Sequence, residues 1–310
     1  MTELAPQELR VLVAVAEAGG FSAAAHRLGI TQSAVSRSVR GSEAKVGAVL
    51  FDRGRAGASP TPAGERAVAL GRRILRLYEV LGAEARAAGR AAAGPGTAEG
   101  LLRIAAFRSA ALHLLPPALE RLAARHPGIR PEIRVVRELG PGTAGEVAAG
   151  RADLAIATLS GPASGPPSGP PSGPSGLPDG LPDGLLSGEL TREAYSLVHP
   201  AGHPDPKALP LLDWDENCGS YTRDWWRAQD WIPRATVKAE DDAMVLTMVG
   251  RGLGMAILPE LSLREATDAV EIAGLGPQGP VRRVGYVTTP ELASTLAVRA
   301  LIRELRAERG

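Results

Sequence analysis

The segment from Phe21 to Arg53, FSAAAHRLGITQSAVSRSVRGSEAKVGAVLFDR, constrains the fold more than any other part of the chain. An alanine-rich run that ends at Gly29 predicts a short helix, because glycine favours helix C-termini. Thr31 can cap a second helix that follows at once, and we expect Ser22 to cap the first. So tight a turn makes two helices cross steeply, as in DNA-binding helix-turn-helix units.

The second predicted helix sorts its side chains by face. Val35 and Val39 share one face and are expected to point into the core. The opposite face carries short hydrogen-bonding side chains and arginines, which suit base edges and phosphates. For any single arginine, a solvated helix face is the alternative. We predict that DNA is bound by this face, by the capping hydroxyls and by the arginines of the following wing: Ser22, Thr31, Gln32, Ser33, Ser36, Arg37, Arg40, Arg53 and Arg55.

Residues 31–53, TQSAVSRSVRGSEAKVGAVLFDR, resemble a segment of LysR-type transcriptional regulators, in which a pattern such as SQPAVSRQIRRLEEELGVRLFER occupies this place. The resemblance continues through RGRAGASPTPAGE (53–65) and implies a winged helix-turn-helix DNA-binding domain over residues 1–62. Gly41 and Ser42 replace a polar residue and a core leucine, so we expect the second helix to fray or pack less well there. In the wing, Pro60 replaces a leucine.

A long helix is predicted after the wing, over residues 63–93, with Thr61 and Pro62 as its N-cap and first-turn residue. Its apolar residues repeat at spacings of 4, 3 and 4, like a coiled-coil seam: Leu70, Ile74, Leu77 and Leu81. A helix with so narrow an apolar stripe needs a partner from another chain. The resemblance implies that this helix is the contact of a homodimer, which could assemble further into a tetramer.

From residue 101 the sequence alternates between strand and helix patterns, which favours a parallel α/β sheet. Predicted strands cover 101–107, 129–139, 151–159, 194–199, 254–261 (a strand and a turn) and 281–289. Predicted helices cover 109–128 (broken at the proline pair), 143–149, the surroundings of Trp225, Ala243–Gly250 and Leu292–Arg306.

This part resembles the effector domain of the same family, in which two α/β lobes are arranged as in periplasmic binding proteins. The likeness is carried by LLP (114–116), GRADLAI (150–156), LVHPAGHP (197–204) and GRGLGMAILP (250–259). The predicted fold class is therefore α/β with an N-terminal all-α winged helix-turn-helix. Residues 94–310 are predicted to form a two-lobed, periplasmic-binding-protein-like effector-binding domain.

The segment 160–188 interrupts this pattern. Its near-tandem SGPP and LPDG units have almost nothing to bury, so we expect disorder or a loose loop. Expansion of a tolerated surface loop is favoured over a proline-rich partner site.

A small-molecule effector is expected in the crevice between the lobes, because strand C-termini and helix N-termini of such sheets face the crevice and bind anions. Arg108 and Ser109 directly follow the first strand, and Arg108 could clamp a carboxylate. A surface arginine is the alternative. The predicted effector-binding residues are Arg108, Ser109, Thr158, Asn217, Ser220, Tyr221 and Thr222.

Charge divides the chain in two. Residues 1–90 contain 13 Lys and Arg against 8 Asp and Glu, a net +5, whereas the remainder contains 22 against 26, a net −4. A basic head on a mildly acidic body is typical of a nucleic-acid-binding domain joined to another domain. Neither a membrane span nor a signal peptide is predicted. The single cysteine, Cys218, fits a reducing cytosol, so we expect a cytoplasmic location.

Catalytic and metal-binding motifs such as HExxH, G-x-x-x-x-G-K-[ST] and G-x-S-x-G are absent, and the five histidines lack metal-ligand spacing. No enzyme activity, metal or cofactor is therefore predicted. The expected partners are double-stranded promoter DNA, a second copy of the chain, an effector and RNA polymerase, but no membrane. A solute-binding protein is the first alternative, opposed by the basic head and by the missing signal peptide. An α/β enzyme is the second, opposed by the missing catalytic motifs.

Overall fold

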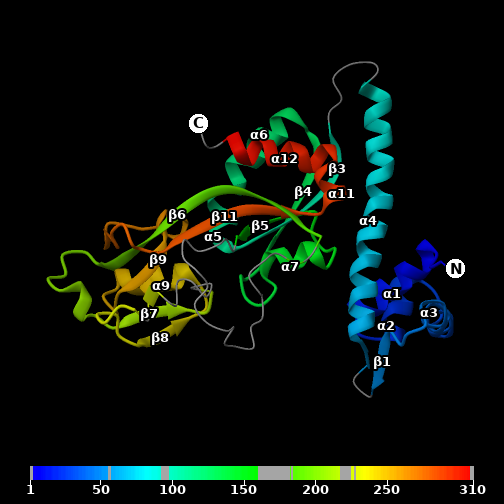
Figure 1. The fold of residues 1–310 in the computed structure, drawn as a ribbon, viewed down its shortest axis with the longest axis horizontal. Helices are drawn as coiled ribbons and strands as arrows, with labels where there is room; N and C mark the ends of the chain where they lie inside the picture. The colour runs from blue at the N-terminus through cyan, green and yellow to red at the C-terminus, as the bar shows by residue number, and fades with distance from the viewer. Residues whose placement is uncertain are drawn as a thin grey trace.

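The computed structural model describes residues 3–54, 57–91, 98–159, 182, 184–216, 225–226 and 228–307. Figure 1 shows a small helical domain, a long helix beside it and a two-lobed α/β domain on the other side of that helix.

The N-terminal domain packs three helices against a two-stranded wing: α1 (Pro6–Ala18), α2 (Phe21–Leu28), α3 (Gln32–Val46), β1 (Phe51–Gly54) and β2 (Gly57–Pro60). Gly29 ends α2 in the left-handed region, at φ 65°, as the glycine position predicted. The helices and the wing share one apolar core, whose fully buried members include Leu12, Val15, Val35, Val39 and Leu50.

Two local predictions were wrong. The N-cap of α2 is Gly20, in extended conformation, and Ser22 is an exposed residue within the first turn of the helix. The helix starts two residues earlier than predicted because Phe21 adopts helical geometry and packs against the core. In addition, α3 does not fray at Gly41 and Ser42. Ser42 is buried and donates a hydrogen bond to the Ser38 carbonyl at 3.0 Å, which satisfies its hydroxyl inside the helix.

The long helix α4 (Pro62–Ala91) begins at the predicted cap, where Thr61 Oγ1 accepts a hydrogen bond from the Gly64 N–H at 3.0 Å. One side of α4 packs against α1 and against the core of the following domain, to which Leu77 contributes. The predicted seam is therefore divided. Leu77 has a partner in its own chain, whereas the other apolar residues of the seam are exposed: Leu70, Ile74 and Leu81, joined by Tyr78.

The first lobe contains three parallel strands in the order β4-β3-β5. Its elements, in chain order, are β3 (Glu99–Ala106), α5 (Arg108–His113), α6 (Leu115–Arg125), β4 (Gly128–Val135), α7 (Gly142–Ala148) and β5 (Leu154–Thr158). The predicted break before the proline pair lies at Leu114, between α5 and α6. The carboxyl ends of β3 and β5 both point toward the second lobe, so the residues after them are brought to the lobe junction.

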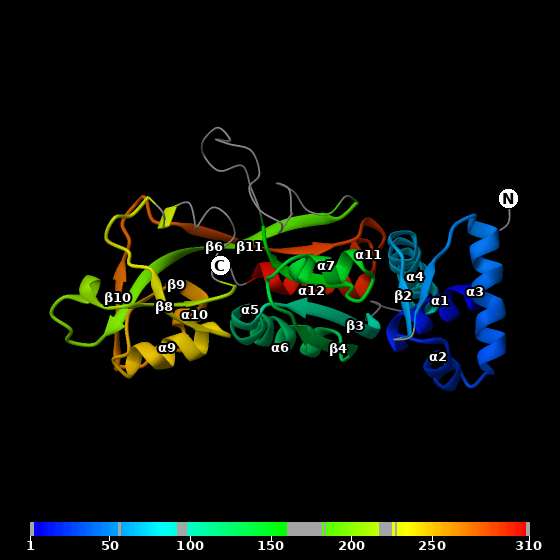
Figure 2. The ribbon, with the colours of Figure 1, turned by 90° about the horizontal axis from the view of Figure 1, so that it is seen from below.

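Two long strands, β6 (Leu186–Pro200) and β11 (Val281–Thr288), run between the lobes (Figure 2). The prediction of parallel strands holds for β4-β3-β5 of the first lobe and for the β7–β8 pair of the second lobe. It fails for β11, which returns from the second lobe and pairs antiparallel with both β5 and β6. The sheet is therefore mixed. Residues 186–188, predicted as part of the insert, belong to β6, where main-chain pairing with β11 outweighs their glycine-rich composition. Residues 160–181 and 183 of the predicted insert lie outside the described part.

The second lobe is built on the far ends of these strands. It contains η1 (Pro206–Ala208), β7 (Leu211–Trp214), β8 (Ala235–Ala239), α9 (Asp242–Gly250), β9 (Ala256–Pro259), α10 (Glu260–Leu263) and β10 (Val270–Gly274). The chain then returns along β11 and ends on the first lobe. The final helix predicted over Leu292–Arg306 is divided into α11 (Pro290–Ala293) and α12 (Leu296–Arg306), because the buried Thr295 turns its hydroxyl to the Leu292 carbonyl at 2.7 Å. Near Trp225, the described helical residues are Trp225 and Trp226.

Candidate DNA interface and lobe junction

The phase of α3 is fixed by its cap and its core residues. Thr31 Oγ1 accepts a hydrogen bond from the Ala34 N–H at 3.2 Å, as predicted for an N-cap. Val35 and Val39 are fully buried. The opposite face of the helix must therefore point to solvent.

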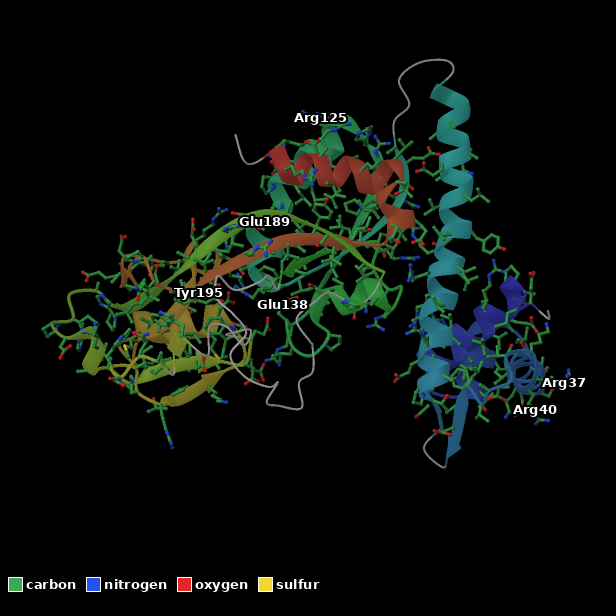
Figure 3. All side chains as sticks on the ribbon, in the orientation of Figure 1. Arg37, Arg40, Arg125, Glu138, Glu189 and Tyr195 are labelled. Carbon is green, nitrogen blue, oxygen red and sulfur yellow. The ribbon has the colours of Figure 1, made fainter. Side chains whose placement is uncertain are left out.

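That opposite face carries the predicted DNA-binding side chains. Those of Gln32, Ser33, Arg37 and Arg40 are exposed, and that of Ser36 is half-buried. Figure 3 shows Arg37 and Arg40 at the outer edge of the domain, pointing away from α4. The face is partly ordered by its own hydrogen bonds, since Arg40 Nη2 donates to Ser36 Oγ at 3.2 Å and the Thr31 and Ser33 hydroxyls lie 3.0 Å apart. Arg55 and the side chain of Arg53 lie outside the described residues.

Two acidic residues that the sequence did not single out hold α3 in place. Glu8 of α1 accepts hydrogen bonds from Lys45 Nζ at 2.7 and 2.8 Å, and this contact lowers the pKa of the Glu8 carboxyl. Glu43 Oε1 accepts from the backbone N–H groups of Leu50 and Phe51 at 2.9 and 3.3 Å. These contacts fix the recognition helix to the first helix and to the start of the wing.

At the lobe junction, Arg108 is already paired. Its Nη1 and Nη2 donate to the two carboxylate oxygens of Glu265 at 2.8 and 3.2 Å, and Nη1 also reaches Asp242 at 3.0 Å. Both carboxylates belong to the second lobe. Burial lowers the pKa of the Arg108 guanidinium, but its bonds to Glu265 and the charge of Asp242 more than offset burial, so that the pKa is raised. Arg108 thus links the lobes in this structure instead of offering a free clamp.

The other predicted residues of the first lobe differ in their access. Ser109 is buried, and Arg282 of β11 donates to its hydroxyl at 3.5 Å. Thr158, at the end of β5, is half-buried and donates its N–H to Glu138 at 3.3 Å. The predicted residues of the second lobe, Asn217, Ser220, Tyr221 and Thr222, lie outside the described residues, as does Cys218.

A second link between the lobes was not predicted. Arg137, two residues beyond β4, donates to Glu216 at 3.2 Å and to Asp215 at 3.4 Å in the second lobe. The Glu138 N–H donates to Glu216 Oε2 at 3.2 Å. Burial raises the pKa of the Glu216 carboxyl against these hydrogen bonds. Arg137 was missed because the strand predicted over 129–139 contains it, whereas β4 ends at Val135. The correct strand end would have placed Arg137 after a parallel strand, as Arg108 is placed after β3.

The side chain of Glu138 is supported from its own lobe. Its carboxylate accepts hydrogen bonds from the Thr143 N–H at 2.9 Å and from the Thr143 hydroxyl at 2.5 Å. Thr143 is fully buried. Thr143 is therefore a support for the junction, and Glu138 is the group that it positions there.

Comparison with known proteins identifies both halves. The model of the LysR substrate binding domain matches residues 95–310, and that of the bacterial regulatory helix-turn-helix protein, lysR family, matches residues 6–65. The chain is 33% identical over 302 residues to the probable HTH-type transcriptional regulator LrrA of Synechococcus elongatus, covering 94% of this chain and 92% of LrrA.

Solved structures of regulators share the fold. ArgP from Mycobacterium tuberculosis superposes with a TM-score of 0.68 at 21% identity, covering 98% of this chain and 97% of ArgP. CbnR in complex with its target DNA superposes with a TM-score of 0.60 at 19% identity, covering 98% of this chain and 99% of CbnR. Among the helices that the structure describes, none is both long and apolar enough to cross a membrane. The matches to both halves confirm the resemblance noted from the sequence and set aside the enzyme and the solute-binding protein: the chain belongs to the LysR family of DNA-binding transcriptional regulators.

Proposed function

We propose that this regulator binds double-stranded promoter DNA with the exposed face of α3 and with the wing. The observation that carries the proposal is the separation of faces on α3, where Val35 and Val39 are buried and Arg37 and Arg40 project outward. CbnR, which has the same fold, was solved with its target DNA. A band-shift assay with the region upstream of the protein's own gene tests the proposal. A complex that random DNA does not displace is expected, and equal displacement by random DNA would contradict it.

The proposal includes a homodimer formed through α4. The exposed fractions of Leu70, Ile74 and Leu81 are 48%, 43% and 64%, and they repeat along one face of the helix. A second copy of the same helix would cover them in an isologous contact, in which the same residues of both protomers are buried. A pair of such dimers is the proposed tetramer.

Substitution of Ile74 and Leu81 by glutamate is expected to weaken this dimer by more than about a hundredfold, because each buried leucine or isoleucine contributes roughly 1.5–3 kcal/mol. Sedimentation velocity over a range of protein concentrations measures the change. Leu253→Glu is a single-substitution control for the added charge, since Leu253 is 56% exposed on the second lobe and outside the seam. An unchanged dimer in the double variant would place the contact elsewhere.

We further propose that a small-molecule effector binds at the lobe junction and changes lobe closure. The links of Arg108 to Glu265 and of Arg137 to Glu216 hold the lobes in the observed arrangement. A ligand that replaces the carboxylate of one of these ion pairs would favour a different arrangement of the lobes. That shift would alter the placement of the paired DNA-binding domains. We propose that the protein acts in the cytoplasm, where it would bind promoter DNA. RNA polymerase is the proposed further partner at the promoter.

A thermal-shift screen of small carboxylates and aromatic acids is expected to identify such a ligand, because one present at a hundred times its Kd stabilises by about 2.7 kcal/mol. Arg108→Met should reduce the affinity of that ligand at least tenfold, because it removes the guanidinium to which the ligand's carboxylate would bind in place of Glu265. Arg130→Met, which removes an exposed arginine of β4, is the control. If the two variants bind the ligand equally well, the effector does not engage Arg108.

A further inference from the structure

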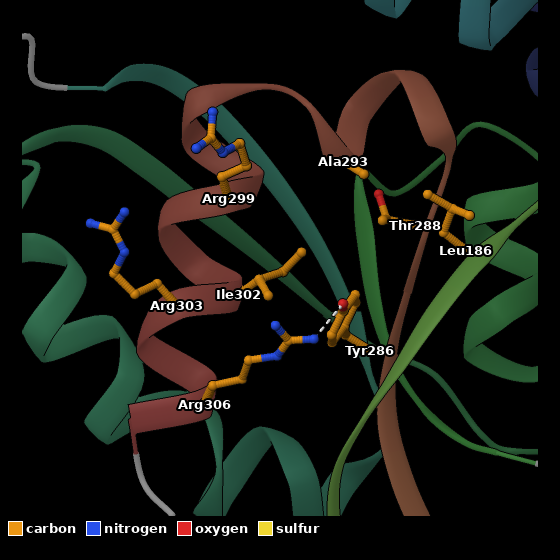
Figure 4. Close-up of a pocket in the computed structure, with 8 residues that line it drawn as sticks. All are labelled: Leu186, Tyr286, Thr288, Ala293, Arg299, Ile302, Arg303 and Arg306. Carbon is orange, nitrogen blue, oxygen red and sulfur yellow. Dashed lines mark hydrogen bonds between the residues drawn. The ribbon is translucent and has the colours of Figure 1, made fainter.

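A pocket of about 450 Å³ lies on the first lobe, at the end of β11 opposite to Arg282 (Figure 4). Its walls come from the first residue of β6, from the last residues of β11, and from α11 and α12. Small-molecule sites in proteins have volumes of roughly 300–1,000 Å³. The pocket therefore has the capacity for a ligand, and it is separate from the lobe junction.

The lining combines an apolar floor with cationic walls. Leu186, Ile302 and the ring of Tyr286 supply the apolar surface. Arg306 extends toward Tyr286, donates to its hydroxyl at 3.0 Å, and places its guanidinium carbon 5.4 Å from the ring centroid. This contact fixes the ring at one side of the pocket.

Arg299 and Arg303 leave the same helix in its two preceding turns, and both are exposed. Among the residues that the structure describes, neither has a carboxylate within ion-pair distance. The only acid of α12, Glu304, is buried on the other side of the helix, where it pairs with Arg121 at 3.5 Å and with Arg125 at 2.5 Å. The positive charge beside the pocket is therefore not neutralised from within α12.

The distribution of acids around α12 bears on what the pocket accepts. A solvated helix face that carries arginines often carries acids as well, in pairs one turn apart. Here the acid is turned inward and the arginines stand beside a hollow with an apolar floor. Guanidinium groups bind carboxylates and sulfonates through paired N–H donors. Aromatic and aliphatic side chains hold an apolar body by contact and by burial of its surface.

We propose that this pocket is a second ligand site, which binds a small organic anion with an apolar body. The anionic group is held by Arg299 and Arg303, and the apolar body lies against Tyr286 and Ile302. The site is independent of the effector site at the lobe junction, since none of its lining residues takes part in the links between the lobes.

Isothermal titration of the full-length protein with naphthalene-2-sulfonate tests this site. One site per chain is expected, and Arg299→Ser/Arg303→Ser should bind the probe at least tenfold more weakly. The control, Arg130→Ser/Arg251→Ser, removes two exposed arginines outside the pocket and changes the net charge equally, so its affinity should stay within twofold of the wild type. The uncharged 2-naphthalenemethanol should bind at least tenfold more weakly than the probe.

Equal affinity of the pocket variant and the control variant would overturn the proposal, as would the absence of binding to the wild type at millimolar probe. Loss of binding in Arg108→Met with retention in the pocket variant would also overturn it, because the anion would then bind at the lobe junction. That last outcome leaves the proposed effector site standing. The two variants therefore separate failure of one site from failure of the other.

Discussion

Replacing Arg76 by alanine is expected to lower the free energy of unfolding by about 3–5 kcal/mol, the range for removing one partner of a buried ion pair. Arg76 of α4 donates from Nε and Nη2 to the two carboxylate oxygens of Asp153, each at 2.8 Å. Its Nη2 also donates to the Leu101 carbonyl at 2.6 Å. The side chains of Arg76 and Asp153 are only 9% and 2% exposed. Without the guanidinium, the Asp153 carboxylate stays buried with the Arg103 N–H as its remaining donor among the described contacts.

Urea unfolding at a fixed protein concentration measures this loss. Arg73→Ala is the matched control. Arg73 also lies on α4 and pairs with Glu291 of the effector domain at 3.2 Å, but the side chains are 23% and 49% exposed. Exposed pairs contribute at most about 1 kcal/mol. If Arg76→Ala costs no more than Arg73→Ala, the Asp153 pair does not stabilise the contact between α4 and the first lobe.

A second variant separates the charge from the packing. Arg76→Met combined with Asp153→Leu removes both charges and fills similar volumes, which is often neutral for a buried pair. The double variant should therefore be more stable than Arg76→Ala. The Arg76–Asp153 pair joins the long helix α4 to the effector domain. Its loss in Arg76→Ala should therefore also weaken any effect of a lobe-junction ligand on DNA binding.

The N-terminal domain could be predicted from sequence because the signals that form it are local. The spacing of Val35 and Val39 gives the phase of α3, and Thr31 and Gly29 give the ends of the two helices. The capping position of Ser22 failed because neighbouring residues can both serve as the helix start, and packing of Phe21 decides between them. The continuity of α3 through Ser42 depends on a hydrogen bond to the preceding turn, which a comparison of side-chain types does not show.

The lobe junction could be predicted only in part, because its contacts join distant parts of the chain. Arg108 was expected there from its place after β3, but its partners Asp242 and Glu265 lie 134 and 157 residues further along the sequence. Neither the spacing nor the periodicity of the sequence predicts an ion pair between residues so far apart. The contacts of Glu138 also include Glu216, 78 residues further along the chain, whereas its contact with Thr143 is local.

The start of β6 shows a different limit. The residues around Leu186 have the composition of the low-complexity segment that precedes them, so composition placed the boundary too late. The strand begins there because β11 returns from the second lobe beside it, with Thr288 opposite Leu186. Long-range pairing thus decides the boundary.

Arg37→Ala is expected to weaken operator binding at least tenfold, about 1.4 kcal/mol, without unfolding the protein or dissociating the dimer. Arg37 is exposed on the face of α3 opposite to Val35 and Val39, so its removal leaves the core intact. A bidentate arginine contact to guanine contributes roughly 1–3 kcal/mol of discrimination. Loss of a phosphate contact instead lowers the affinity for all sequences and reduces the salt slope by about one.

Salt titrations of the wild type and the variant on operator and random DNA assign the role of Arg37. A loss on operator alone means that Arg37 reads a base, whereas an equal loss on both DNAs with a shallower slope means that it anchors the backbone. Arg10→Ala, which removes an exposed arginine of α1 in the same domain, controls for the change in charge and should shift both affinities by less than the Arg37 variant. Unchanged affinity of Arg37→Ala on both DNAs would mean that the outer face of α3 does not meet the DNA. The proposed interface would then have to lie on another surface of the domain.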